Sequence, residues 1–160
     1  MAHERCHNLG ITKSSTLGNC YMVEDIIGKG GFGVVAKCRK TDTNRAVAIK
    51  ISKSEADILE QAVEEIAILK RLRCLNPDTS NIVQWHGFFF HKGNIYTTFE
   101  LLNQSLYHYL KEQHTRGLTM GELKPILHQL ATALAHVHSI DIRRQTGFGF
   151  RLVLTSRSDL

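Results

Sequence analysis

Three glycines at a fixed spacing, set between two β-rich runs, constrain this chain more than any other feature of its 160 residues. They are Gly28, Gly30 and Gly33, and Gly31 adds a fourth between them. Apolar residues end the run before them and begin the run after them, which predicts a strand, a turn and a second strand. Glycine backbone bends freely and approaches phosphate oxygens without an intervening Cβ. The pattern therefore predicts a glycine-rich hairpin that covers phosphate groups.

A dinucleotide-binding fold uses the same glycine spacing, but there the last glycine opens a helix. Here the apolar run of residues 34–38 follows directly, then the polar turn of residues 41–44, then the apolar run of residues 46–49. Two such runs around a polar turn are typical of a hairpin. This context favours the strand–turn–strand interpretation over the dinucleotide fold.

Lys50 ends a run of small and apolar residues, where a cation needs a partner. Downstream, apolar residues recur at helical spacing between residues 55 and 73 and predict a helix; they are Ile58, Leu59, Ala62, Val63, Ile66, Leu69 and Leu72. Glu64 and Glu65 on this helix are both candidates to reach Lys50. An isolated Lys and Glu are usually solvated surface charges. With the glycine loop upstream, we expect an ion pair instead, and Glu65 is the preferred partner.

The following segments predict two further strands and two helices. Residues 81–90 and 95–99 are β-rich runs separated by a turn signal at residues 92–94. A short helix is expected at residues 106–110. Thr119 and Glu122 have the spacing of a capping box for a longer helix, although Pro125 lies near its start. The apolar stripe of that helix consists of Ile126, Leu127, Leu130, Leu134 and Val137.

On these motifs, residues 21–142 resemble the first part of a eukaryotic Ser/Thr protein kinase domain. The resemblance is closest to the homeodomain-interacting protein kinases and the dual-specificity tyrosine-regulated kinases, through residues 65–72, 99–107 and 123–134. It implies an α+β fold, with a kinase-like small lobe at residues 21–102 that contains a five-stranded antiparallel sheet and helix C. The first two helices of an incomplete large lobe follow at residues 103–142, a disordered lead is expected at residues 1–20, and a divergent basic tail at residues 143–160.

The resemblance also implies roles for individual residues. Gly28, Gly30 and Gly33 would cover the phosphates of ATP, and Lys50 would meet the α- and β-phosphates. Glu65 takes the place of the helix C partner of Lys50, Phe99 takes the gatekeeper place, and Glu100 to Leu102 take the place of the hinge that binds adenine. The complete set of expected nucleotide contacts is Ile27, Gly28, Gly30, Gly33, Val35, Ala48, Lys50, Phe99, Glu100 and Leu102.

The resemblance stops at Ile142, where an active relative continues into a His-x-Asp catalytic loop and later an Asp-Phe-Gly metal motif. Residues 147–149 read Gly-Phe-Gly, and glycine has no carboxylate to offer Mg²⁺. Asp159 has only Leu160 after it and nothing nearby to position its carboxylate. We therefore expect an ATP-binding chain that lacks the catalytic Asp and the Mg²⁺ ligands of the complete domain. The alternative is a non-catalytic interaction module that binds a partner through the apolar helix at residues 119–138.

Charge and cysteine usage limit the other functions. The formal net charge is +5; residues 143–160 hold four Arg and one Asp, so the tail contributes +3. No amphipathic helix or interleaved aromatic residues accompany these arginines, so neither specific nucleic-acid binding nor membrane binding is expected. Four cysteines without Cys-x-x-Cys spacing predict reduced thiols and no metal site. The expected partners are ATP and a protein substrate, partner kinase or scaffold, in the nucleus or cytoplasm.

Overall fold

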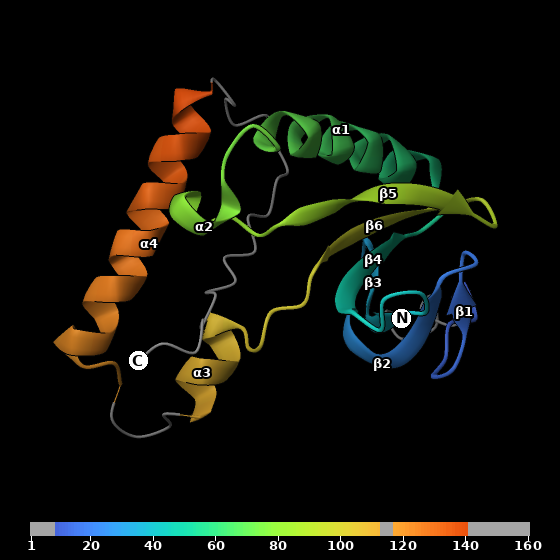
Figure 1. The fold of residues 1–160 in the computed structure, drawn as a ribbon, viewed down its shortest axis with the longest axis horizontal. Helices are drawn as coiled ribbons and strands as arrows, with labels where there is room; N and C mark the ends of the chain where they lie inside the picture. Colours follow the sequence, from blue (N-terminus) through green and yellow to red (C-terminus); the bar gives the residue numbers. More distant parts are fainter. Residues whose placement is uncertain (1–8, 113–116, 141–160) are drawn as a thin grey trace. The chain divides into compact units, whose positions relative to one another are not determined.

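The computed structural model describes residues 9–112 and 117–140 of the chain. The elements in chain order are β1 (Thr16–Leu17), β2 (Tyr21–Gly30), β3 (Gly33–Lys40), β4 (Ala46–Ser52), α1 (Ala56–Leu72), α2 (Pro77–Ser80), β5 (Trp85–His91), β6 (Asn94–Glu100), α3 (Leu106–Glu112) and α4 (Met120–Ser139). Figure 1 shows these elements along the chain. The chain divides into two compact units, Met1–Ala67 with Trp85–Leu101 and Ile68–Gln84 with Leu102–Leu160. All six strands belong to the first unit.

The strands form one antiparallel sheet in the order β1-β2-β3-β4-β6-β5. The α+β fold expected from the sequence is confirmed, and the five strands expected at residues 21–102 are β2 to β6; a sixth strand outside that range joins the same sheet. The additional strand is β1, only two residues long, which pairs Thr16 with Met22 and Leu17 with Tyr21. A two-residue strand is too short to show the alternation by which strands are recognised in a sequence.

Residues 9–20 therefore differ from the disordered lead that we expected. Leu17 is 3% exposed within the main core, and Leu9 and Ile11 pack against the same core. Lys13 forms an ion pair with Asp25 of β2 at 3.2 Å. These contacts join residues far apart in the chain, so the order of this segment depends on packing against the folded sheet. Residues 1–8 and 141–160, where the rest of the expected lead and all of the expected tail fall, lie outside the described residues.

The two faces of the sheet have different roles, and β4 shows this most clearly. Val47, Ile49 and Ile51 are at most 3% exposed and belong to the main core, whereas Ala48 and Lys50 between them are only half-buried. Successive side chains of a strand point to opposite faces, so Ala48 and Lys50 lie on the face of β4 that is turned away from the main core. The main core also contains Leu17, Val23, Val34, Ala36, Cys38 and Tyr96.

Cys38 belongs to this core as an inert thiol. Its side chain is fully buried and its Sγ donates to the carbonyl oxygen of Ala36 at 3.8 Å. Burial raises the pKa of the thiol to about 12, with a smaller contribution from the carboxylate of Glu24. The thiolate is the reactive form, so Cys38 is protected from oxidation and alkylation in the folded protein.

Helix α1 covers the second face of the sheet. Ala62 and Ile66 are 5% exposed and pack with Ile95 of β6 in a smaller core, against which Leu59, Trp85 and Phe88 also pack. Figure 1 shows α1 alongside β5 and β6. The helix runs from Ala56 to Leu72, within one residue of the expected bounds, because its apolar residues recur every three or four positions.

The second unit contains α2, α3 and α4. Helix α4 begins with the expected capping box: the Thr119 hydroxyl accepts from the backbone N–H of Glu122 at 3.3 Å, and the Glu122 carboxylate accepts from the Thr119 N–H at 2.8 Å. Tyr109 of α3 donates to the same carboxylate at 3.1 Å. Pro125 lies inside the helix and does not end it. Within the described part of the chain, no helix has the length and hydropathy needed to span a bilayer.

Leu17→Ala tests whether residues 9–20 are part of the folded unit. The substitution leaves a cavity in the main core, and we expect it to lower the free energy of unfolding by about 2–3 kcal/mol in urea denaturation. Thr16→Ala is the matched control: Thr16 is exposed on the same strand, and its loss should cost less than about 0.5 kcal/mol. Equal stabilities for the two variants would mean that β1 contributes nothing to the fold.

Candidate nucleotide-binding site

The glycine-rich segment forms the tip of the β2–β3 hairpin. Gly30 ends β2, Gly33 begins β3, and the two are paired across a turn made of Gly31 and Phe32. A Cβ added at Gly30 or Gly31 would meet no heavy atom within 4 Å. The tip is therefore open above these two residues, and their backbone is accessible to a ligand.

Gly33 is required by packing as well as by conformation. Its φ is +152°, and a Cβ at this position would lie 2.0 Å from the carbonyl oxygen of Ile51 on β4. The backbone of Lys53 also donates to the Phe32 carbonyl oxygen at 3.3 Å. The hairpin tip therefore packs directly against the end of β4, at residues 51–53, which follow Lys50 in the chain. The glycine spacing in the sequence identifies Gly33 but not the close contact with Ile51 that requires it.

Lys50 and Glu65 form an ion pair between Nζ and Oε2, in agreement with the sequence-based expectation. Their side chains are 30% and 21% exposed, so the pair is screened by water less than a surface pair. Lys50 is fixed further through its backbone, whose carbonyl oxygen accepts from the Thr97 hydroxyl at 3.3 Å. Glu64, the other candidate, is exposed. Helix α1 and strand β4 thereby place an anion beside a cation on the second face of the sheet.

Four more of the expected residues share that face. Val35 of β3 is the cross-strand partner of Lys50, and Ala48 of β4 is the partner of Phe99 on β6. Gly28 of β2 is in turn the partner of Val35. Directly opposed residues of neighbouring strands point to the same side, so these residues form one continuous surface around the Lys50 side chain.

The remaining expected residues are Ile27, Glu100 and Leu102, and the strand register does not place them on the surface around Lys50. Ile27 lies on β2 at a register shift and is 49% exposed. Glu100 is the last residue of β6 and half-buried. Leu102 belongs to the second unit. Their roles in nucleotide binding stay predictions.

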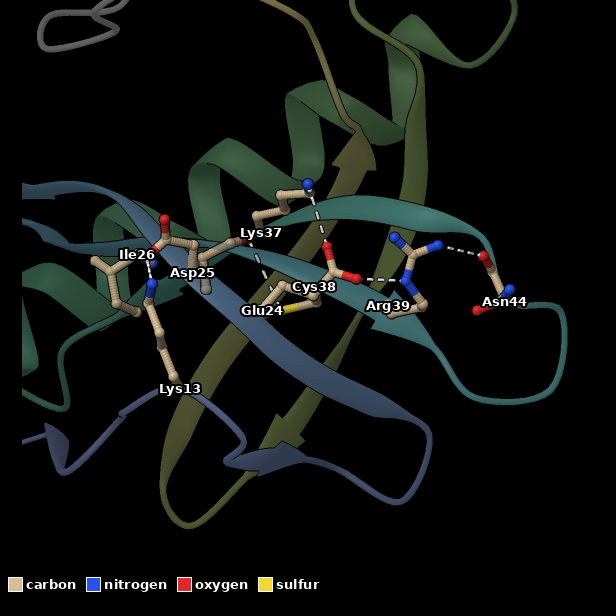
Figure 2. Close-up of polar contacts among 9 residues, drawn as sticks. Lys13, Glu24, Asp25, Ile26, Lys37, Cys38, Arg39 and Asn44 are labelled. Atoms are coloured by element: carbon tan, nitrogen blue, oxygen red, sulfur yellow. Dashed lines mark hydrogen bonds and ion pairs between the residues drawn. The ribbon is translucent and has the colours of Figure 1, made fainter.

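An ion cluster on β2 and β3 adjoins this surface, and sequence analysis missed it. The Glu24 carboxylate accepts from Lys37 at 3.2 Å and also from Nε of Arg39, while Arg39 donates through a second nitrogen to the Asn44 carbonyl oxygen at 2.9 Å (Figure 2). Lys37 is the cross-strand partner of Ala48, so it projects on the same face as the candidate site. The hydrogen bond from Arg39, followed by that from Lys37, lowers the pKa of Glu24 against the opposing effect of burial.

Asp25 holds a second ion pair beside this cluster. It accepts from Lys13 and from the backbone N–H of Ile26, at 3.2 and 2.9 Å, and these contacts lower its pKa (Figure 2). The adjacent residues Glu24 and Asp25 both form ion pairs. A register shift between Val23 and Asp25 interrupts the strict alternation of side chains along β2 and allows this. Strand alternation read from the sequence assigns Glu24 and Asp25 to opposite faces but cannot locate such a shift.

Among the described residues, no group of three or more His, Cys, Asp or Glu side chains has the arrangement of a metal site. The free cysteines of the described part of the chain are Cys20, Cys38 and Cys74. The Gly-Phe-Gly segment and Asp159, which sequence analysis rejected as metal ligands, lie outside the described residues.

Comparison with known proteins identifies the family to which this arrangement belongs. Residues 21–144 match the family described as "Protein kinase domain". The chain belongs to the protein kinase family. The matched range, residues 21–144, nearly coincides with the range of residues 21–142 over which the sequence motifs resemble a protein kinase domain.

The chain is 39% identical over 127 residues to "Homeodomain-interacting protein kinase 1" of Mus musculus, covering 79% of this chain and 10% of that protein. It is 38% identical over 128 residues to the protein of the same name from Caenorhabditis elegans, covering 80% of this chain and 15% of that protein. The "Dual specificity protein kinase YAK1 homolog" of Arabidopsis thaliana is 37% identical over 117 residues, with 72% and 12% covered. The chain therefore spans a small part of the curated relatives that it matches.

A kinase domain of known crystal structure has the same fold, with a TM-score of 0.76 and 26% sequence identity. The match covers 81% of this chain and 38% of that kinase domain. The protein kinase fold is thus supported independently by sequence and by structure.

Gly33→Ala should destabilise the hairpin tip by about 1–3 kcal/mol, because the new methyl group collides with the β4 backbone at a positive φ. Gly31→Ala provides the matched control: it adds the same atom two residues away, in open space, and should change the free energy of unfolding by less than about 0.5 kcal/mol. Urea unfolding of both variants checks this. The structure of the tip would be contradicted if Gly31→Ala proved the more damaging substitution.

Glu24→Gln should reduce the acid sensitivity of the fold. A carboxylate whose pKa is lowered by folding stabilises the native state above its unfolded pKa, and this contribution is lost as the pH falls through the folded pKa. The variant should be less stable than the wild type at pH 7, and its stability should fall less steeply between about pH 5 and about pH 3. Glu60→Gln, on the exposed surface of α1, is the control and should follow the wild-type pH profile.

Proposed function

We propose that this chain carries the ATP-binding part of a protein kinase that transfers phosphoryl groups from ATP to protein Ser or Thr hydroxyls in its complete domain. The observation that supports the proposal best is the Lys50–Glu65 ion pair, on the sheet face that ends at the open glycine hairpin. Family membership raises the expectation of ATP binding, and the geometry supplies groups suited to a triphosphate.

Lys50 acts in this proposal as a fixed point charge. Its ammonium group would bind the α- and β-phosphates, and Glu65 would hold it in position through their ion pair. Placement of a cation before the ligand arrives reduces the ordering cost of binding. The accessible backbone at Gly30 and Gly31 would supply N–H groups to the outer phosphates, since no side chain occupies the space above them.

The base would lie against the apolar residues of the same face. Val35 and Ala48 present small side chains there, and Phe99, the cross-strand partner of Ala48, would limit the depth of the pocket. Ile27, Glu100 and Leu102 would complete the adenine contacts, with the backbone after β6 donating and accepting hydrogen bonds. This arrangement agrees with the usual character of nucleotide sites, which are mostly apolar with a few well-placed polar groups.

We assign ATP binding, and not turnover, to residues 1–160 alone. The catalytic Asp and the metal-binding Asp of the family pattern do not occur after Ile142 in these 160 residues. Mg²⁺ in protein kinases neutralises charge on the β- and γ-phosphates. Here Lys50 and the hairpin backbone would have to bind the triphosphate without the protein ligands for that ion, so weaker binding than in a complete kinase domain is expected.

A second candidate function is supported by one observation on α4. Met120, Leu127 and Leu134 recur every seven residues along this helix and are 65%, 51% and 41% exposed. Residues seven apart lie on one side of a helix, so these three side chains form an apolar stripe that faces water. A non-catalytic interaction module would use this stripe to bind a partner protein. Nucleotide binding distinguishes the two candidates, because the module does not need it.

Isothermal titration calorimetry of the purified chain with ATP tests the proposal. We expect saturable binding in the presence and absence of Mg²⁺, and a loss of at least about tenfold in affinity for Lys50→Ala, equivalent to about 1.4 kcal/mol. Lys124→Ala is the control, since it removes an exposed cation from α4 and leaves the candidate site intact. Circular dichroism of both variants establishes that they are folded.

Two results would contradict ATP binding. One is the absence of binding to the folded wild-type chain at millimolar ATP. The other is binding that Lys50→Ala and Lys124→Ala weaken equally, which would indicate non-specific attraction between the basic chain and the triphosphate.

A further inference from the structure

Lys37 lies beside the residues proposed to hold the base, yet the expected nucleotide contacts do not include it. Its cross-strand partner on β4 is Ala48, and the partner of Ala48 on β6 is Phe99. Directly opposed residues of neighbouring strands point to the same side of a sheet. Lys37, Ala48 and Phe99 therefore form one row, with Ala48 in the middle, on the face that carries Lys50. We call these three residues the base row.

The alternation of side chains along β3 supports this direction for Lys37. Ala36 and Cys38, its neighbours in the chain, are fully buried in the main core. Successive side chains of a strand point to opposite faces, so Lys37 points away from that core. The Lys37 side chain is 38% exposed, so most of it is already withdrawn from water.

The ammonium group of Lys37 is held by Glu24. The two form an ion pair at 3.2 Å, although the register of β2 and β3 places Asp25 opposite Lys37. Asp25 is engaged elsewhere, by Lys13 and by the backbone N–H of Ile26. Strand β2 lies on the side of β3 away from β4, so the ion pair draws the charge of Lys37 away from the middle of the base row.

The carboxylate of Glu24 is fixed in turn by Arg39. It accepts from Nε of Arg39, and a second nitrogen of Arg39 donates to the Asn44 carbonyl oxygen at 2.9 Å (Figure 2). The Glu24 side chain is 25% exposed, less than either cation that it binds. Contacts from the β3–β4 turn through Arg39 and Glu24 thus set the position of Lys37.

A lysine held in this way presents its methylene groups to the face of the sheet. Lysine stems commonly lie along apolar surface while the charged end stays at its edge. Phe99 is at one end of the base row and Lys37 is at the other. A flat base over Ala48 would therefore lie between an aromatic ring and an aliphatic stem. Because the stem is fixed before the ligand arrives, the ordering cost of this contact is reduced.

We propose that Lys37 forms the wall of the base site opposite Phe99, through its aliphatic stem and not through its charge, and that Glu24 is the positioning residue that holds this stem in place. The inference rests on the proposed ATP binding and adds to it the residue that bounds the base on the β3 side. Lys37 thereby differs from Lys50, whose charge is proposed to bind the phosphates.

Three ligands separate contacts with the base from contacts with the phosphates: ATP, adenosine and inorganic tripolyphosphate, each titrated by calorimetry into the full chain. Lys37→Ala removes the stem and should weaken ATP and adenosine by a similar factor, about three- to tenfold. It should change tripolyphosphate binding by less than about twofold. Lys50→Ala should give the reverse pattern, with weaker binding of ATP and tripolyphosphate and unchanged binding of adenosine.

Lys37→Met distinguishes the stem from the charge. Methionine keeps an unbranched apolar side chain and removes the ammonium group, so this variant should bind ATP and adenosine within about twofold of the wild type. An equal loss of adenosine binding in Lys37→Ala and Lys37→Met would overturn the proposal, because the charge would then be the group that matters.

A double-mutant cycle tests the positioning role of Glu24. Glu24→Gln alone should weaken adenosine binding about threefold, because the released ammonium group is drawn into water and takes the stem with it. In the Lys37→Met background the same substitution should have no effect, since methionine has no charge to be held. Equal effects of Glu24→Gln in both backgrounds would contradict a role exerted through Lys37.

Lys40→Ala is the matched control. Lys40 lies on the same strand and is also ion-paired, with Asp42 at 3.0 Å, but it alternates to the face opposite Lys37. This variant should bind all three ligands as the wild type does. Urea unfolding identifies the conditions in which every variant is folded, and the titrations are made there.

The ligand set also distinguishes failure of this inference from failure of ATP binding. Unchanged adenosine binding in Lys37→Ala, together with loss of ATP binding in Lys50→Ala, would overturn the role of Lys37 and leave the nucleotide site standing. Absence of both ATP and adenosine binding to the folded wild-type chain at millimolar concentration would overturn the proposed function and this inference with it.

Discussion

The structure depends on the strict two-sidedness of β4. Its odd-numbered side chains, Val47, Ile49 and Ile51, form the centre of the main core, and this leaves Ala48 and Lys50 on the other face. Burial of the three apolar residues fixes the register of the strand, since a slip of one residue would exchange the two sets. The position of the Lys50 cation is thus determined by the hydrophobic effect on the opposite side of the sheet.

The candidate nucleotide site is arranged around that cation. Helix α1 buries Ala62 and Ile66 against β6 and thereby brings Glu65 to Lys50. The β2–β3 hairpin rests on β4 through Gly33, so its open tip ends near the same strand. A half-buried ion pair is costly to desolvate and is kept where a fixed charge is needed, in agreement with a role in anion binding.

Sequence patterns predicted the local elements of this arrangement well. The glycine hairpin, the helix that carries Glu65 and the capping box of α4 each depend on residues close together in the chain, and the structure confirms them. The five strands expected at residues 21–102 are present, whereas β1 was not expected, because it is two residues long and forms only through its pairing with β2. The Glu24 cluster was missed for a related reason: a register shift in β2 decides which acidic residue meets Lys37 and Arg39.

The sequence alone determined the family, the sheet-and-helix content and the pairing of Lys50 with Glu65, since periodicity and motif spacing carry that information. The tertiary structure decided what depends on long-range packing. It ordered residues 9–20 by burying Leu17, required glycine at residue 33 through the carbonyl oxygen of Ile51, and curled the sheet until the β1–β2 turn met Phe89. None of these contacts joins residues near in the chain, so none leaves a periodic trace in the sequence. They arise when burial of the main core fixes the curvature of the sheet.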